Sequence, residues 1–183
     1  VLEASRPQGS PRLRAAIAAQ LRGFRGMEVH PDQIVIGSGA QSLYGLLVQL
    51  LGRDLVYGVE DPGYPRLTRI YESNDVTVRP IALDGEGPVL ESLERARIDV
   101  LHCTPSHQFP TGGVMPAPRR AQMLRWAAEQ EGRYLIEDDY DSEYRYAGRP
   151  IPALQGSDLH DRVIYCGTFS RSLAPSFRIA YLV

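Results

Sequence analysis

The chain has 183 residues, of which 43% are hydrophobic and 23% charged, enough to bury one substantial core. Its formal net charge is -2 and it contains no run of like charge, so composition gives no electrostatic footprint for nucleic acid or an anionic membrane. No stretch approaches the roughly 18 apolar residues of a membrane span, and the N-terminus lacks a signal-peptide pattern. We therefore expect a cytoplasmic α/β protein, with Cys103 and Cys166 as reduced core residues.

Lysine is missing from the sequence altogether. The combined count of lysine and arginine is 20, and all 20 are arginines. A bias towards arginine codons explains most of them, but a guanidinium does not replace an amine in chemistry that requires a nucleophilic nitrogen.

Hydrophobic periodicity predicts helices and strands that alternate along the chain. The predicted helices cover residues 11–22, 40–51, 66–72, 89–95 and 118–131. The predicted strands cover residues 33–36, 55–59, 76–81, 99–103, 134–136, 163–166 and 179–183. The first helix begins with Ser10 as N-cap and Pro11 in its first turn, and we expect it to end near Gly23. Residues 84–88 read as a loop, and residues 145–161 as irregular.

Such alternation indicates a mostly parallel sheet with helices on both faces. Ligands of these sheets collect at the carboxyl ends of the strands. We therefore expect the loops after Ile36, Val59, Cys103, Ile136 and Cys166 to be neighbours. The final apolar strand has no closing element, which suggests that the natural protein continues beyond Val183.

A glycine turn, Gly37 to Gln41, joins a predicted strand to a predicted helix, and its backbone N–H groups suit a phosphate. The same turn fits the first two glycines of a dinucleotide-binding motif, with Glu60 at a plausible distance for a ribose hydroxyl. Ser42 opposes that interpretation, because it stands where the third glycine or alanine belongs. A purely structural helix start is the third possibility.

Aromatic and acidic residues follow two other strands. Tyr64, on a proline-rich turn, can present its ring to a planar ligand, or it simply packs on its neighbours. Asp138 lies between Glu137 and Asp139, and three adjacent acids repel unless one has a cationic partner. A protonated ring nitrogen is such a partner; alternatively, Asp138 caps a helix or pairs with an arginine. Tyr140 is placed to contact a hydroxyl of the same ring, or is simply a loop tyrosine.

The last strand–loop–strand unit carries Thr168, Ser170 and Arg178. Two hydroxyls and a guanidinium are what a phosphate requires for charge-assisted hydrogen bonds. Solvated loop polarity is the alternative. His107 and Cys103 show no metal-ligand spacing, so we expect no metal site.

Five segments occur in the order and spacing of MocR-type regulators: SGAQ, EDPGYP, PSHQFPTG, EDDYDSEYRY and GTFSRSLAPSFRIAY. The chain thus resembles the aminotransferase-like domain of that family, which has the fold of type I pyridoxal-phosphate (PLP) enzymes. The resemblance implies that residues 1–183 are part of the large, PLP-binding domain. A winged helix-turn-helix of the GntR kind would precede them, and a small domain would follow.

The resemblance also implies which residues hold PLP. The phosphate would be held by Ser38, Gly39, Ala40, Gln41, Thr168, Ser170 and Arg178. Tyr64 would stack on the ring, Asp138 would keep its nitrogen protonated, and Tyr140 would contact its hydroxyl. Phe109 stands where related aminotransferases have asparagine, which favours the regulator branch.

Arg171 departs from the family pattern, because it occupies the position of the Schiff-base lysine. A guanidinium does not form an aldimine, and the chain has no other lysine. Transamination is therefore not expected, and Arg171 indicates either non-covalent binding of PLP or of a PLP adduct, or a degenerate site.

These observations lead to the prediction of an effector-sensing domain of a transcription regulator. We expect its effector to be an amino acid or a PLP vitamer and its DNA contacts to lie outside this sequence, and the resemblance implies a homodimer. A free-standing transaminase, whose natural parent has lysine at position 171, is the alternative. A dinucleotide-binding domain is the third interpretation.

Overall fold

A computed structural model describes residues 6–141, 144 and 152–183. Its helices are α1 (Pro11–Arg25), α2 (Ala40–Leu51), α3 (Pro65–Glu72), α4 (Leu90–Ala96) and α5 (Ala117–Ala128), with 3-10 turns η1 (Pro31–Gln33), η2 (Gln155–Ser157) and η3 (Pro175–Phe177). Its strands are β1 (Val35–Gly37), β2 (Val56–Asp61), β3 (Thr77–Asp84), β4 (Gly87–Pro88), β5 (Val100–Cys103), β6 (Tyr134–Asp139), β7 (Val163–Thr168) and β8 (Ala180–Leu182).

The strands form one sheet in the order β1-β8-β7-β6-β5-β2-β3-β4. Strands β3, β2, β5, β6 and β7 are parallel to one another, whereas β8 is antiparallel to both of its neighbours. The carboxyl ends of β1, β2, β5, β6 and β7 consequently lie along the same edge of the sheet. The predicted mostly parallel sheet is confirmed.

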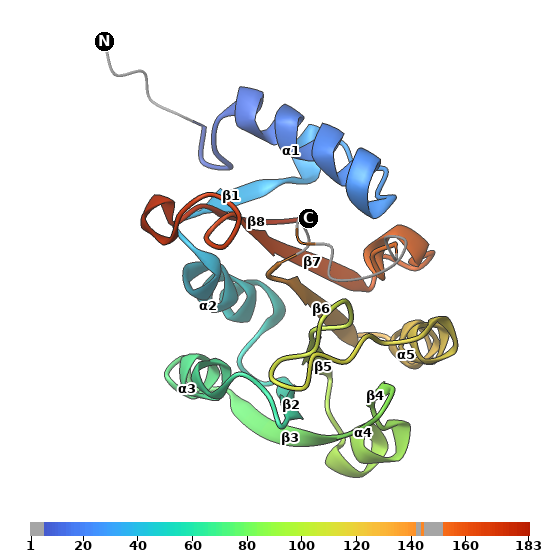
Figure 1. The fold of residues 1–183 in the computed structure, drawn as a ribbon. Helices are drawn as coiled ribbons and strands as arrows, with labels where there is room; N and C mark the ends of the chain where they lie inside the picture. Colours follow the sequence, from blue (N-terminus) through green and yellow to red (C-terminus); the bar gives the residue numbers. More distant parts are fainter. Residues whose placement is uncertain (1–5, 142–143, 145–151) are drawn as a thin grey trace.

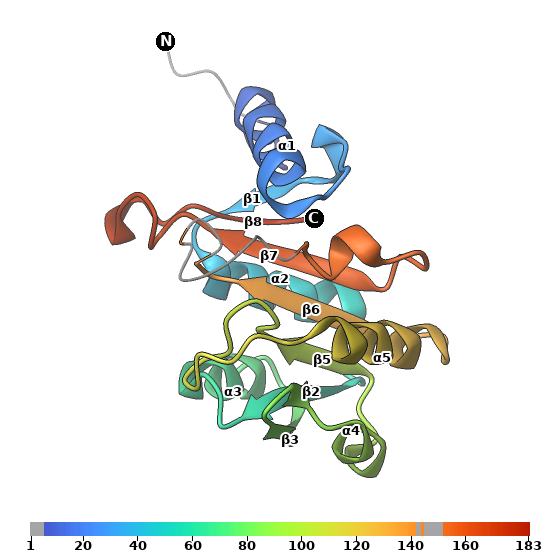
Figure 2. The same ribbon diagram turned by 45° about the vertical axis from the view of Figure 1, so that its right-hand side comes forward.

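Helices cover both faces of this sheet (Figures 1 and 2). Helices α2 and α3 pack on one face, where Leu47 and Leu67 belong to the same core cluster. Helices α4 and α5 cover the other face through Leu93 and Trp126, and α1 packs there at the β7–β8–β1 end through Leu21. The chain therefore has three layers, as expected for alternating strands and helices.

Side chains of β6 alternate between these two faces. Leu135 packs with α5, and Ile136 packs with α2. The same alternation directs Glu137 and Asp139 to the α5 and α1 face and Asp138 to the α2 face. Of the three adjacent acids, only Asp138 therefore lies on the same face as α2.

Helix α1 is longer than predicted. It passes through Gly23 and ends at Gly26, whose φ of 65° gives the left-handed conformation typical of a C-cap. A β-carbon at Gly23 would meet nothing within 4 Å, so neither space nor backbone conformation requires glycine at this position. The additional turn carries Arg25, which is 6% exposed, into the core.

The sheet also differs from the prediction at several ends. Gln33 lies in η1 rather than in the first strand, and β2 continues to Asp61. Strand β6 continues through the three acids to Asp139. Within the expected loop 84–88, Gly87 and Pro88 form β4, which pairs antiparallel with the end of β3. Local propensity misses the additional strand residues Asp61, Asp139 and Gly87 because their positions in the sheet depend on neighbouring strands.

Cys103 and Cys166 are both buried and unbonded, as expected for core thiols. Among the described residues, none of the helices combines the length and the apolarity needed to cross a membrane.

Candidate functional site

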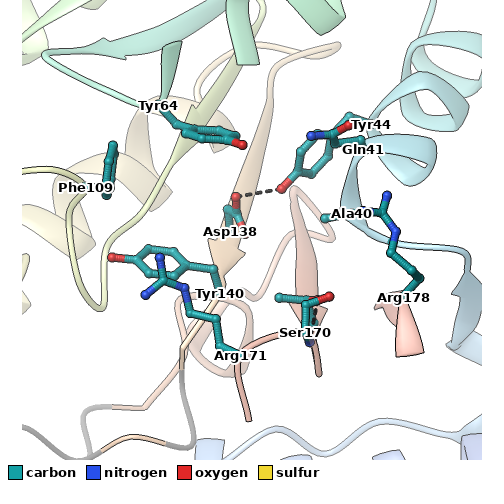
Figure 3. A pocket seen from close by; sticks show the side chains of 12 residues that line it. Ala40, Gln41, Tyr44, Tyr64, Phe109, Asp138, Tyr140, Ser170, Arg171 and Arg178 are labelled. Carbon is teal, nitrogen blue, oxygen red and sulfur yellow. Dashed lines mark hydrogen bonds between the residues drawn. The ribbon is translucent and has the colours of Figure 1, made fainter. Parts of the chain in front are cut away.

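A cavity of about 260 Å³ opens at the carboxyl edge of the sheet (Figure 3). Its walls come from the start of α2, from the loops after β2 and β5, from the end of β6 and from the β7–β8 connection. The lining residues are Gly39, Ala40, Gln41, Tyr44, Tyr64, Phe109, Asp138, Tyr140, Thr168, Ser170, Arg171 and Arg178. Side chains far apart in sequence meet here because the parallel strands end at one edge.

The start of α2 forms one end of the cavity. Gly39 is its N-cap, and α2 has neither a capping side chain nor an acidic residue in its first turn. The backbone N–H groups of that turn therefore keep their capacity to bind an anion. Gly39 has a φ of 94°, and a β-carbon there would lie 3.0 Å from Nη2 of Arg178. Glycine thus allows the Arg178 guanidinium to lie against the helix start.

The β7–β8 connection adds hydroxyls to the same end. The Oγ1 atom of Thr168 lies 3.2 Å from Oγ of Ser170, and the Ser170 backbone N–H donates to that Oγ1 atom. Arg178 has a left-handed φ of 49° two residues before β8, which returns the chain to the sheet beside β7. Helix start, hydroxyls and guanidinium together make a concave anion-binding surface.

Asp138 forms the floor of the cavity. Tyr44 donates its hydroxyl to Oδ2 of Asp138 at 2.7 Å, and Nε2 of His102 lies 3.4 Å from the same oxygen. The hydroxyl of Tyr71 is in turn 2.7 Å from Nδ1 of His102. Burial, followed by the charge of Asp138, raises the pKa of Tyr44 well above its ordinary value. Tyr44 therefore remains a hydrogen-bond donor to the carboxylate.

Asp139 and Glu137 are occupied elsewhere, on the opposite face of the sheet. Nε of Arg25 lies 2.8 Å from Oδ2 of Asp139, to which Tyr165 also donates its hydroxyl. Glu137 accepts hydrogen bonds from the backbone of Leu154 and Gln155. The arginine pair that the sequence left open for the acidic triplet thus belongs to Asp139, and Asp138 faces the cavity.

Aromatic rings form the remaining walls. Tyr64 and Phe109 pack edge to face, with ring centroids 6.0 Å apart. The guanidinium carbon of Arg171 lies 5.0 Å from the centre of the Tyr140 ring, and the Tyr140 hydroxyl lies 3.2 Å from Nδ1 of His107. Arg171 and Tyr140 occupy one side of the cavity, across Ser170 from Arg178 (Figure 3).

The structure brings ten of the eleven candidate residues to the cavity lining. Ser38 is the exception, because its side chain is exposed in the turn before Gly39. The roles assigned to these residues in binding a cofactor remain predictions. Parts of the EDDYDSEYRY segment, residues 142–143 and 145–146, lie outside the described residues.

Tyr44 lines the cavity although the sequence motifs do not identify it as a site residue. It follows Ala40 by four residues, so it lies one turn further on the same side of α2, and this spacing was the only signal that could have identified it. Glu60, on which the dinucleotide interpretation depended, does not line the cavity. Its carboxylate accepts hydrogen bonds from Thr104 and Gln108 instead.

Comparison with known proteins identifies the family of this chain. Residues 1–183 match the family described as aminotransferase class I and II. The chain belongs to this family. Among curated relatives, it is 46% identical over 175 residues to the uncharacterized HTH-type transcriptional regulator YdeL of Bacillus subtilis. It is 42% identical over 176 residues to the pyridoxine biosynthesis transcriptional regulator PdxR of Corynebacterium glutamicum. Each alignment covers 96% of this chain and 38% of the relative.

Solved structures of aminotransferases share the fold. An archaeal alanine:glyoxylate aminotransferase superposes with a TM-score of 0.89 at 28% identity, over 98% of this chain and 47% of that one. The α-aminoadipate aminotransferase LysN of Thermus thermophilus, complexed with N-(5'-phosphopyridoxyl)-L-leucine, gives 0.86 at 28% identity, over 99% and 47%. The chain thus spans about half of these structures and less of the regulators. It has the large-domain fold of type I aminotransferases.

Residues 6–141, 144 and 152–183 contain no group of three or more histidine, cysteine, aspartate or glutamate side chains that could hold a metal ion.

Proposed function

We propose that this chain is the PLP-binding, effector-sensing domain of a MocR-type transcription regulator. One observation carries the proposal: the cavity places an anion-binding surface at one end and a hydrogen-bonded carboxylate, Asp138, on its floor. Family membership and similarity to the regulators YdeL and PdxR support it. DNA binding would come from a segment outside residues 1–183, and the assembly would be a cytoplasmic homodimer.

The cavity residues fit PLP. The start of α2, Thr168, Ser170 and Arg178 would hold its phosphate, and Asp138 would pair with its protonated ring nitrogen. Tyr64 would cover the ring and Tyr140 would meet its hydroxyl. The Tyr44 hydroxyl would orient the Asp138 carboxylate towards the ring. When bound, PLP supplies an aldehyde and a ring that withdraws electrons from attached groups.

Covalent attachment of PLP is not part of this proposal. Arg171 lines the cavity at the position where the family carries its lysine, and the whole sequence contains no lysine. A guanidinium remains charged and is not a nucleophile at physiological pH. The domain would therefore bind PLP, or a molecule built on it, through non-covalent contacts, and the amino acid or vitamer that it senses would enter and leave freely.

Titration of the full-length protein with PLP, followed by borohydride reduction and mass spectrometry, tests the proposal. Wild type should bind PLP without a mass increase at Arg171, whereas Arg171→Lys should gain one phosphopyridoxyl group on that peptide. Arg162→Lys, remote from the cavity, is the matched control and should gain none. Absence of PLP binding in wild type would refute the proposal, and a covalent adduct at Arg171 would refute its non-covalent part.

A free-standing transaminase is the second candidate, favoured by the 28% identity and 0.89 TM-score to an aminotransferase structure. It would require an amine at position 171. Amino-group transfer from an amino acid to a keto acid by Arg171→Lys, without regulated DNA binding by the full-length protein, would select this function, and regulated DNA binding would select the first.

A further inference from the structure

The cavity has two cationic groups, only one of which the proposed phosphate site uses. Its charged lining residues are one carboxylate, Asp138, and two guanidinium groups, Arg171 and Arg178. In the described part of the chain, neither arginine is within ion-pair distance of an acidic side chain. A ligand that carries only a phosphate would leave Arg171 without an anionic partner.

Arg171 is held in place by its surroundings. Its guanidinium carbon lies 5.0 Å from the centre of the Tyr140 ring, within the range of a cation–π contact. Its backbone carbonyl accepts a hydrogen bond of 2.7 Å from the Tyr144 hydroxyl. A guanidinium fixed on a ring face still presents its N–H groups at its edge, which is the geometry that binds a carboxylate through two hydrogen bonds.

The two guanidinium groups are separated by the place where the ring would lie. Figure 3 shows Arg178 beside the start of α2 and Arg171 beside Tyr140, with Asp138 and Ser170 between them. A ligand matching all three charges has a phosphate at one end, a protonated ring nitrogen over Asp138, and a second anionic group near Arg171.

We infer that this site selects a phosphopyridoxyl–amino acid adduct over the free vitamer, and that Arg171 binds the carboxylate of its amino-acid part. The inference rests on the proposed function and names its ligand class. The substitution that removes the amine from this position thereby supplies a carboxylate receptor. The adduct is taken up already formed, so no bond is made or broken in the site.

The test compares two ligands that differ at the amino group. N-(5'-phosphopyridoxyl)-L-leucine carries a carboxylate, whereas pyridoxamine 5'-phosphate has the same ring and phosphate without one. Isothermal titration of the full-length wild-type protein should show at least ten-fold tighter binding of the leucine compound. Arg171→Met should reduce that preference to less than about three-fold while it changes affinity for pyridoxamine 5'-phosphate little.

Three further variants separate this role from general electrostatics and from misfolding. Arg162→Met removes a guanidinium that lies over another tyrosine ring, Tyr134, at 5.6 Å and outside the cavity, so it should keep the preference. Arg178→Met should weaken both ligands. Arg171→Lys keeps the charge and should retain a preference of several-fold, even if Arg171→Met folds poorly.

The outcomes separate the inference from the function on which it rests. If wild type binds both ligands equally, or if Arg171→Met weakens both to the same extent, the carboxylate receptor is refuted while PLP binding stands. If wild type binds neither ligand, the proposed function fails together with the inference.

Discussion

Arg25 and Asp139 form a buried ion pair between the end of α1 and the end of β6, with Nε 2.8 Å from Oδ2 and side chains that are 7% and 1% exposed. This pair explains how three consecutive acids coexist in one strand. Asp139 takes the arginine on one face of the sheet, which leaves Asp138 to face the cavity from the other. The arginine therefore supports the candidate site without touching it.

Replacing Arg25 with methionine should lower the free energy of unfolding by about 3–5 kcal/mol, because the Asp139 carboxylate would remain buried without its cation. Urea unfolding of the full-length protein at pH 7 measures this change. The control is Arg22→Met, which breaks an equally short pair with Glu28 whose side chains are 65% and 72% exposed. That variant should lose less than about 1 kcal/mol. Equal losses in the two variants would show that burial of the Arg25 pair is unimportant.

The pH dependence of stability should carry the signature of Glu137. Burial, with the nearby Asp139 carboxylate, raises the pKa of Glu137 to about 7 from its ordinary value of 4.5, against the lowering effects of two backbone hydrogen bonds and Arg25. Between pH 4.5 and about pH 7, the folded protein keeps a proton on Glu137 that the unfolded chain releases. Stability should therefore fall as pH rises through this window, by up to about 1.4 kcal/mol per unit for this group.

Glu137→Gln does not titrate, so its stability should change less than that of wild type between pH 5 and 7.5. Urea midpoints across that range provide the measurement. A residual slope of the same sign is expected from Asp139, since burial raises the pKa of this group as well. Glu131→Gln, at an exposed position, is the control and should follow wild type. Parallel curves for wild type and Glu137→Gln would contradict the assignment.

Gly39→Ala should weaken binding of pyridoxamine 5'-phosphate by about ten-fold. The new β-carbon would lie 3.0 Å from Nη2 of Arg178, and the φ of 94° disfavours any side chain at a cost on the order of 1–3 kcal/mol. Isothermal titration gives the affinity, and thermal unfolding gives the stability. On the same helix, Gly45→Ala meets its nearest atom, Asn74 Oδ1, at 3.6 Å and should leave the affinity unchanged. An unchanged affinity in Gly39→Ala would remove the helix start from the proposed phosphate site.

Phe109→Ala should weaken binding of the ligand's pyridine ring, because Phe109 supports the Tyr64 ring that would cover it. The two rings pack edge to face, a contact worth about 0.5–1.5 kcal/mol, so affinity for pyridoxamine 5'-phosphate should fall between two- and ten-fold. Global stability should change little, because Tyr64 and Phe109 are 41% and 37% exposed. Leu159→Ala, at another exposed apolar position, should affect neither quantity. A loss of stability without a loss of affinity would assign Phe109 to the fold rather than to the site.

Much of the site could be predicted from short segments of sequence. The glycine turn before α2, the hydroxyls of Thr168 and Ser170 and the final Arg178 have local signatures that suit an anion. Alternation of strands and helices places such segments at one sheet edge, because parallel strands share the direction of their carboxyl ends. The absence of an amine at position 171 follows from the sequence and the family resemblance, without the structure.

Other features depend on packing between segments far apart in the chain. No local pattern predicts that Arg25 pairs with Asp139 or that Tyr44 bonds to Asp138. Both contacts join a helix to β6, and the order of strands in the sheet determines where those helices pack. Helix α1 and strand β6 exceed their predicted ends for the same reason. From the sequence alone come the alternating α/β architecture, the anion-binding segments and the loss of lysine. The tertiary structure decided which acid faces the cavity, since alternation along β6 and the position of Arg25 together separate Asp138 from its neighbours.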